Sequence, residues 1–276
     1  MTSGPPDALR EQAREWGRGL LSAAPWSAVA DRVTLLLVEP PAGLYGAPAP
    51  AVSFWLTLDQ EAARSLPPEY REPLTTNRAV IEHPRIADLP PATLSVTTDD
   101  ALHRLLQGTT RSAMEARWLV RHVDIVSDRL RRGEQYALRA NLVADDAPER
   151  IVRGLWVDAV SAARALDVMT VDPAGGLTAA GEVMGALCRL ACFDHGGSYP
   201  PSSYLRAVAR ETRLGKRINP WLDDLTKAVS GDEVAARRII GSRDQVIEEA
   251  RTVLGERYRN RPWLRDPDAF ALQPPR

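Results

Sequence analysis

The chain has 276 residues, of which 44% are hydrophobic and 26% charged, and its formal net charge is -1. These values are ordinary for a globular protein of one large or two small domains. The balanced charge gives no electrostatic support for binding to nucleic acid or to a membrane surface. The start, MTSGPPDALREQ, lacks the order of a signal peptide, and no apolar run approaches the ~20 residues of a membrane helix. A cytoplasmic protein is therefore expected.

The amino-terminal part predicts a helix followed by the strands of a small sheet. Apolar residues recur at helical spacing over Asp7–Leu21. The run Val33–Val38 is typical of a strand buried on both faces, and Val52–Leu58 alternates like a second strand. Leu94–Val96 predicts a third strand. Prolines interrupt residues 67–91, which are expected to be irregular.

From Ser112 onward the apolar pattern becomes helical. Ser112 and Glu115 have the spacing of a capping box, and one apolar face then continues to Val126. Residues Val183–Cys192 are apolar on nearly all sides, so their helix is expected at the centre of a bundle. A last long helix is predicted to begin at Ser242.

This pattern divides the chain into two domains. Residues 1–110 are predicted to form an α+β domain, and residues 111–276 a helical domain. A cleft is expected between them, because ligand sites often lie at domain interfaces.

Three stretches carry a resemblance to a known family. Ser53–Asp59 precedes the Leu-Pro and Tyr-Arg segment at 66–71, Glu115–Asp128 reads EARWLVRHVDIVSD, and Leu187–Ala207 places Gly-Gly and Tyr-Pro-Pro between two helices. In this order they resemble the nucleotidyltransferase superfamily, in particular its kanamycin-nucleotidyltransferase type. The resemblance implies an α+β fold, with a small mixed sheet and helices followed by a C-terminal helical bundle.

The resemblance also implies a metal site that this sequence lacks. Members of the superfamily carry Gly-Ser after the first strand and two carboxylates at alternate positions of the second, which bind Mg²⁺. Here the loop reads EPPAGLYG, and the second strand places Ser53, Trp55 and Thr57 on one face. We therefore expect that the active site is degenerate. The protein is then repurposed either to bind a small molecule or to act as an altered enzyme, in a biosynthetic pathway.

Two alternatives stay open. The first is an active transferase on a small-molecule acceptor, with a nucleotide and Mg²⁺ held by Glu39, Asp59 and Asp99 near predicted strand ends. Glu61 and Asp100 lie beside them, and polar residues at strand ends also serve solubility, which is the simpler interpretation. The second alternative is a non-enzymatic protein that binds a partner.

Trp55, Arg117 and Arg121 are candidate ligand-binding residues of the amino-terminal half. The two arginines share a predicted polar helix face with Asp124 and Asp128. Guanidinium groups bind carboxylate or phosphate in a planar, two-pronged way. A solvated face with weak internal ion pairs, each worth ~0.3–0.5 kcal/mol, is the alternative and the simpler one.

Tyr199 and Tyr204 flank the proline elbow. The resemblance implies that this elbow borders the acceptor-substrate side of the cleft, where rigid prolines would fix an aromatic wall. Tyrosines packed over an ordinary interhelical turn are an equal alternative. The expected partner is thus a small-molecule ligand, and a homodimer is possible.

Cys188, Cys192 and His195 lie on one face of a predicted helix. Three such side chains could begin a metal site, but no fourth ligand is evident and the spacing matches no common zinc pattern. Two buried thiols and a histidine near a helix carboxyl end explain the pattern more simply. No metal is therefore predicted here.

Overall fold

The computed structural model describes residues 6–39, 52–75, 79–83, 92–142, 146–170 and 172–268. They form two compact units, Met1–Val143 and Ala144–Arg276. This boundary differs from the predicted one at residue 110, because the elements up to residue 142 pack with the sheet of the first unit. The cleft between the two units stays a prediction.

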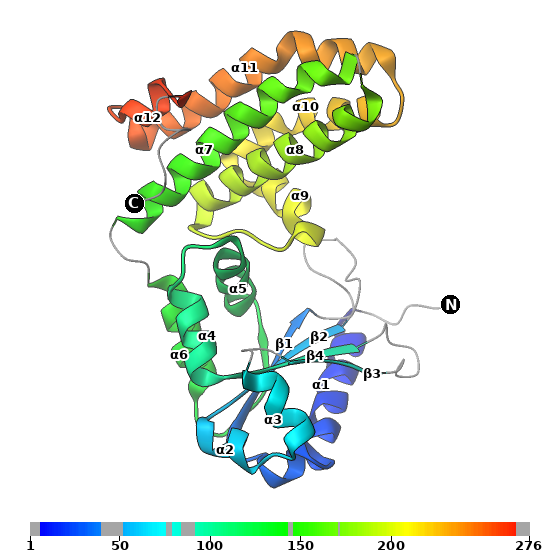
Figure 1. Ribbon diagram of the computed structural model, residues 1–276, viewed down its shortest axis with the longest axis vertical. Coiled ribbons are helices and arrows are strands. Elements are labelled where there is room, and N and C mark those ends of the chain that lie inside the picture. Colours follow the sequence, from blue (N-terminus) through cyan, green and yellow to red (C-terminus); the bar gives the residue numbers. More distant parts are fainter. Residues whose placement is uncertain are drawn as a thin grey trace. The chain divides into compact units, whose positions relative to one another are not determined.

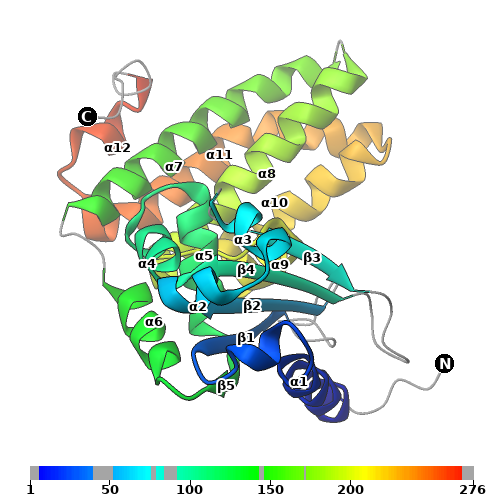
Figure 2. The same cartoon turned by 60° about the horizontal axis from the view of Figure 1, so that its bottom comes forward.

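The first unit is built on a five-stranded mixed sheet with the order β3-β4-β2-β1-β5 (Figure 2). β2 and β4 run parallel, whereas the other neighbouring strands run antiparallel. The three predicted strands are confirmed, and two more join them. The strands are β1 (Val33–Glu39), β2 (Val52–Leu58), β3 (Ala79–His83), β4 (Ala92–Thr98) and β5 (Asp124–Asp128).

One face of this sheet is apolar. Successive side chains of a strand point to opposite faces, so Leu35, Phe54 and Leu94 share one side. They form a buried cluster with residues of α1 (Pro6–Ser22) and α2 (Gln60–Ser65). α1 confirms the predicted first helix, and its Trp16 ring lies 5.0 Å from that of Phe54.

The stretch 67–91 contains more regular structure than its prolines predicted. α3 (Pro68–Thr75) and β3 both fall within it. Pro68 is the first residue of α3, where a proline lacks only an amide that would have had no helical partner. The proline therefore begins a helix rather than interrupting structure.

Three helices contact the opposite face of the sheet: α4 (Asp99–Gln107), α5 (Arg111–Arg121) and α6 (Arg132–Asn141). Thr110 caps α5 by accepting a hydrogen bond from the Ala113 amide at 3.3 Å, so the predicted capping box at Ser112 was wrong. α5 also ends at Arg121, and the residues that follow form β5. The single long helix predicted through Val126 was therefore wrong as well.

The second unit is all helical, and Figure 1 shows its long helices running alongside one another. α7 packs against α8, and α10 packs against both α8 and α11. The helical bundle of the predicted fold class is confirmed. Its elements are α7 (Ala147–Ala165), η2 (Leu166–Thr170), α8 (Pro173–Gly196), α9 (Ser202–Glu211), α10 (Arg213–Val229), α11 (Glu233–Tyr258) and α12 (Pro262–Arg265).

α8 is the central helix of this unit, as its all-round apolar sequence predicted. Val183, Leu187 and Leu190 are buried in it. Gly197 caps its carboxyl end, and the φ of +68° at this residue lies in the left-handed region that glycine adopts without a steric penalty. Residues Ala174–Gly196 are long and apolar enough to cross a membrane, but 61% of the most apolar window is buried, as in the core helix of a folded domain.

The start of α11 differs from the prediction. The helix begins at Glu233, and the Asp232 carboxylate caps it by accepting a hydrogen bond from the Ala235 amide at 2.9 Å. Ser242 lies inside the helix and donates its hydroxyl proton to the Arg238 carbonyl at 2.7 Å. A serine bonded to its own helix in this way no longer resembles a cap.

Candidate functional site

Two of the predicted acidic residues lie where the neighbouring strands β2 and β4 end. β2 and β4 are parallel and in register, with Leu58 opposite Thr98, so Asp59 and Asp99 follow neighbouring strand ends. Glu39 ends the antiparallel strand β1 and pairs with Ser53 at the far end of β2, roughly 20 Å away at 3.3 Å per residue. Its carboxylate accepts a hydrogen bond from the Ser53 hydroxyl at 2.7 Å. Glu39 therefore does not share a site with the other two.

Arginine side chains neutralise the two aspartates. The Arg132 guanidinium lies 3.2 Å from the Asp59 carboxylate and also forms an ion pair with Asp99. Arg32 lies 3.0 Å from Asp59 and 2.7 Å from Glu61. Because a guanidinium stays protonated in proteins, Arg132 is a permanent cation between the two acids. We call Asp59, Asp99 and Arg132 the bridged aspartate pair.

These contacts stabilise the ionised form of Asp59. Burial opposes its ionisation, but the Ala62 amide donates to the carboxylate at 2.7 Å, and the guanidiniums of Arg132 and Arg32 add to this. The net effect lowers the pKa of Asp59. Within the described residues, no group of three or more histidine, cysteine or acidic side chains lies close enough together to hold a metal ion.

A buried tyrosine continues the network. The Tyr136 hydroxyl donates to Asp99 and lies 2.8 Å from the Thr57 hydroxyl. Burial raises the pKa of Tyr136, and the hydrogen bond to Asp99 raises it further. Tyr136 therefore remains a protonated donor at every physiological pH.

The turn before α6 positions Arg132. The Asp128 carboxylate accepts hydrogen bonds from the Arg132 amide at 2.9 Å and the Gly133 amide at 2.7 Å, and from the Thr34 hydroxyl at 2.9 Å. A Cβ at Gly133 would lie 2.8 Å from the terminal methyl of Ile125 and 3.0 Å from the Asp128 carboxylate, so a larger residue there would have to displace these side chains. Sequence reasoning missed Arg132 and Tyr136. The sequence signal that could have pointed to this turn is Asp128, which stands five residues before Gly133 at the start of a helix.

A pocket of about 470 Å³ lies on the polar face of the sheet, beside this network. Trp55, which is 9% exposed, lines this pocket, and its ligand-binding role stays a prediction. Ser95 is the register partner of Trp55, and Thr97 that of Thr57, so the pocket adjoins the bridged aspartate pair. The pocket is lined by Trp55, Ser95, Thr97, Ala101, Leu102, Arg104, Leu105, Gly108, Thr110 and Ser112.

Arg117 and Arg121 serve the ends of helices. Arg117 is 1% exposed and its Nε donates to the Leu106 carbonyl at 2.5 Å, in the last turn of α4. Arg121 donates to the Ala140 carbonyl at 2.9 Å, in the last turn of α6. Cations are stabilising at such carbonyl-rich ends. Burial lowers the pKa of both groups.

The shared polar helix face predicted for these arginines was wrong. Asp124 and Asp128 lie on β5 rather than on the helix, and Asp124 pairs with Arg10 at 2.7 Å. Arg117 is buried rather than solvated. The ligand-binding role of the two arginines stays a prediction. To bind a ligand, their side chains would have to give up the hydrogen bonds to the Leu106 and Ala140 carbonyls.

The candidates of the helical unit are mostly buried. Tyr199 and Tyr204 are 4% and 0% exposed, which fits packing better than an open aromatic wall. Cys188 and Cys192 are buried free thiols, whereas His195 is exposed. The three do not share one environment.

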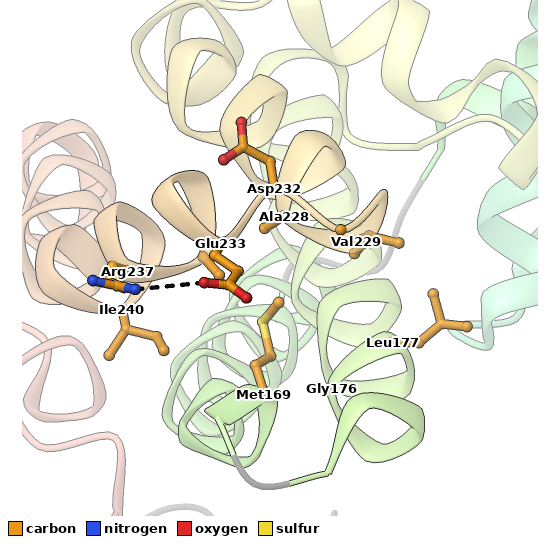
Figure 3. Close-up of a pocket in the computed structure, with 11 residues that line it drawn as sticks. Met169, Gly176, Leu177, Ala228, Val229, Asp232, Glu233, Arg237 and Ile240 are labelled. Atoms are coloured by element: carbon orange, nitrogen blue, oxygen red, sulfur yellow. Dashed lines mark hydrogen bonds and ion pairs between the residues drawn. The ribbon is translucent and has the colours of Figure 1, made fainter.

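The helical unit has a second pocket, of about 480 Å³, at the connection between α10 and α11 (Figure 3). Glu233 and Arg237 form an ion pair of 3.5 Å at its rim, and both are well exposed, so water and salt weaken the pair. Leu177 points away from the other side chains drawn. The pocket offers no cluster of reactive groups, and the Trp55 pocket is therefore the better candidate.

No protein-family model matches the chain, and no curated protein sequence matches it. Among solved structures it is similar to a nucleotidyltransferase-like protein from Exiguobacterium sibiricum 255-15, with a TM-score of 0.43 and 13% identity. The match covers 91% of this chain and 81% of that one. A likeness this distant carries no argument about activity.

Proposed function

We propose that this protein is a nucleotidyltransferase-like scaffold without metal-dependent transfer, which binds a small molecule in the Trp55 pocket. One observation carries the proposal. The pocket-facing positions of the two central strands are Trp55, Ser95 and Thr97, while the nearest acids, Asp59 and Asp99, share Arg132.

The charges around the pocket argue against a metal-assisted reaction. Mg²⁺ in such sites is bound by one or two carboxylates together with substrate phosphates, and a guanidinium ion-paired to those carboxylates repels it. To bind Mg²⁺, Asp59 and Asp99 would have to give up Arg132, and Asp59 would also have to give up Arg32. The arginines thus supply the positive charge that a metal would bring to the ends of β2 and β4.

The pocket itself suits a small ligand. Its volume lies within the ~300–1,000 Å³ typical of ligand sites, which combine apolar walls with a few polar groups. Trp55 and Leu105 provide apolar surface, and Ser95 and Thr97 carry hydroxyls at the sheet floor. Hydroxyls can orient a ligand by donating or accepting hydrogen bonds.

A thermal-shift screen tests the proposal. It compares nucleotides with and without Mg²⁺, divalent metals alone, and a metabolite collection. A matched variant, Ala101→Phe, fills the pocket from α4. We expect a metabolite to raise the melting temperature of the natural protein but not that of Ala101→Phe, and we expect no Mg²⁺-dependent shift with any nucleotide.

The opposite result favours the active transferase. Stabilisation by a nucleotide only with Mg²⁺, lost in Asp59→Asn or Asp99→Asn, would overturn the proposal. The partner-binding alternative, the homodimer, the biosynthetic role and the cytoplasmic location stay predictions.

A further inference from the structure

We infer that the ligand of the Trp55 pocket is an amphipathic monoanion: an apolar, preferably aromatic body with one carboxylate or other singly charged acidic group. The inference rests on the proposed function, since it names the ligand class of the same pocket. The inference depends on Arg104, which is the one charged residue among the described residues that line the pocket.

The Arg104 side chain has no partner in the part of the chain that the structure describes. It projects from α4, is exposed, and makes no hydrogen bond or ion pair with any described residue. Asp100 is one turn earlier on the same helix, but its carboxylate accepts from the Gln60 amide at 3.3 Å. Other arginines of the first unit do have acidic partners; Arg111 and Glu115, for example, lie 2.8 Å apart.

The rest of the lining selects an apolar body. Trp55 offers a large flat surface, and Leu102 and Leu105 add aliphatic groups from α4. Aromatic side chains bind flat ligands well because they bury a large area with little loss of rotamer freedom. The Thr110 hydroxyl at the rim is already used, since it accepts from the Ala113 amide and lies 3.1 Å from the Ser112 hydroxyl.

The number of cationic side chains that line the pocket determines the ligand charge that the pocket can neutralise. One guanidinium binds one carboxylate through two parallel hydrogen bonds. A nucleoside triphosphate has several negative charges, and no cationic side chain besides Arg104 lines this pocket in the described chain. A monoanion is therefore matched, whereas a polyanion would be left largely uncompensated.

Two dyes test the inference on the full chain. 8-Anilinonaphthalene-1-sulfonate has an aromatic body with one negative charge, and Nile red is aromatic and neutral. We expect Arg104→Gln to weaken binding of the anionic dye about tenfold and that of Nile red less than about twofold, since a charge-assisted hydrogen bond contributes at least that much. Arg104→Lys should restore part of the loss.

The control is Arg18→Gln, which removes another exposed cation, from α1, the helix packed on the apolar face of the sheet. It should change neither dye. Ala101→Phe should abolish specific binding of both. Circular dichroism and melting curves confirm that each variant is folded.

The outcomes separate the two proposals. If Ala101→Phe removes binding of both dyes but Arg104→Gln leaves the anionic dye unchanged, the pocket binds ligands and the charge inference is wrong. If neither dye responds to Ala101→Phe, the proposed function itself fails. An equal loss of both dyes in Arg104→Gln also overturns the inference, because the arginine would then act through packing.

Discussion

The hydroxyl of Thr57 on β2 lies 2.8 Å from the hydroxyl of Tyr136 on α6. This contact begins a chain of hydrogen bonds and ion pairs that leads through Tyr136 to Asp99 and Arg132. The network fastens α6 to the sheet, so it has a structural role that can be measured apart from any ligand.

Tyr136→Phe should destabilise the protein by about 1.5–3 kcal/mol, the usual loss for a buried hydrogen bond to a charged group. The ring still fills its space, so the effect reports the hydroxyl alone. Urea unfolding followed by circular dichroism measures it. Tyr70→Phe is the matched control, because Tyr70 is only partly buried, and a change within about 0.5 kcal/mol is expected there. Equal stability of both variants would show that the network contributes nothing.

The bridged aspartate pair should behave as a coupled unit. Arg132→Met keeps an unbranched, largely apolar stem but leaves Asp59 and Asp99 without their shared cation, and a loss of about 1–3 kcal/mol is expected. Unfolding free energies of Arg132→Met, Asp99→Asn and the double variant form a thermodynamic cycle. Its coupling energy should be roughly 0.5–3 kcal/mol, and strictly additive losses would contradict the bridge.

Trp55 and the pair of Asp59 and Asp99 could be located from the sequence because they depend on strand alternation and on strand ends. Both features are local, and the parallel register of β2 and β4 then brings the two acids together. Arg132 could not be found in this way, because its partners come from two other strand ends far along the chain.

The stretch EARWLVRHVDIVSD shows the limit of periodicity. Trp118, Val123 and Val126 fit one helical face, yet the chain leaves the helix after Arg121 and adds β5 to the sheet edge. Pairing with β1 provides Asp124–Asp128 with backbone hydrogen bonds that a single-helix interpretation does not foresee. For the same reason the sequence places Arg117 on a polar helix face, since helix spacing alone does not show that α4 ends beside it.

Asp59 should make the stability of the protein depend on acid pH. Its pKa is lowered in the folded state, so the unfolded state binds more protons at acid pH. The stabilisation is then fully present above the ordinary aspartate pKa near 4 and is lost as pH falls through the lower folded value. Asp59→Asn can still cap α2, so it removes mainly the charge.

Unfolding free energies measured from neutral pH down to about pH 3 test this. The natural protein should lose more stability over that range than Asp59→Asn, by about 1 kcal/mol for an ion pair that is partly exposed. Asp100→Asn is the control, since Asp100 is exposed and its carboxylate accepts only a 3.3 Å bond from Gln60 among the described residues. Parallel pH curves for the natural protein and Asp59→Asn would refute the assignment.

The two thiols of α8 should be inert in the folded protein. Burial raises the pKa of Cys188 to about 11 and also raises that of Cys192. The thiolate is the reactive form of cysteine. On the order of one Cys188 side chain in a thousand would be ionised at pH 8, and that side chain is buried as well. An aromatic disulfide reagent should therefore label neither thiol in native buffer and both in denaturant.

Labelling over a series of urea concentrations gives the sharper test. If both thiols react only with the global unfolding transition, α8 is the stable core that its burial indicates. Ser198→Cys adds a third thiol just beyond the left-handed turn at Gly197, at a position that is also buried but lies outside the helix. Its labelling at lower urea than Cys188 and Cys192 would show that the elbow opens before the helix. Rapid labelling of Cys188 and Cys192 in native buffer would instead mean that α8 exchanges with open states, and the helical unit would then lack a fixed core.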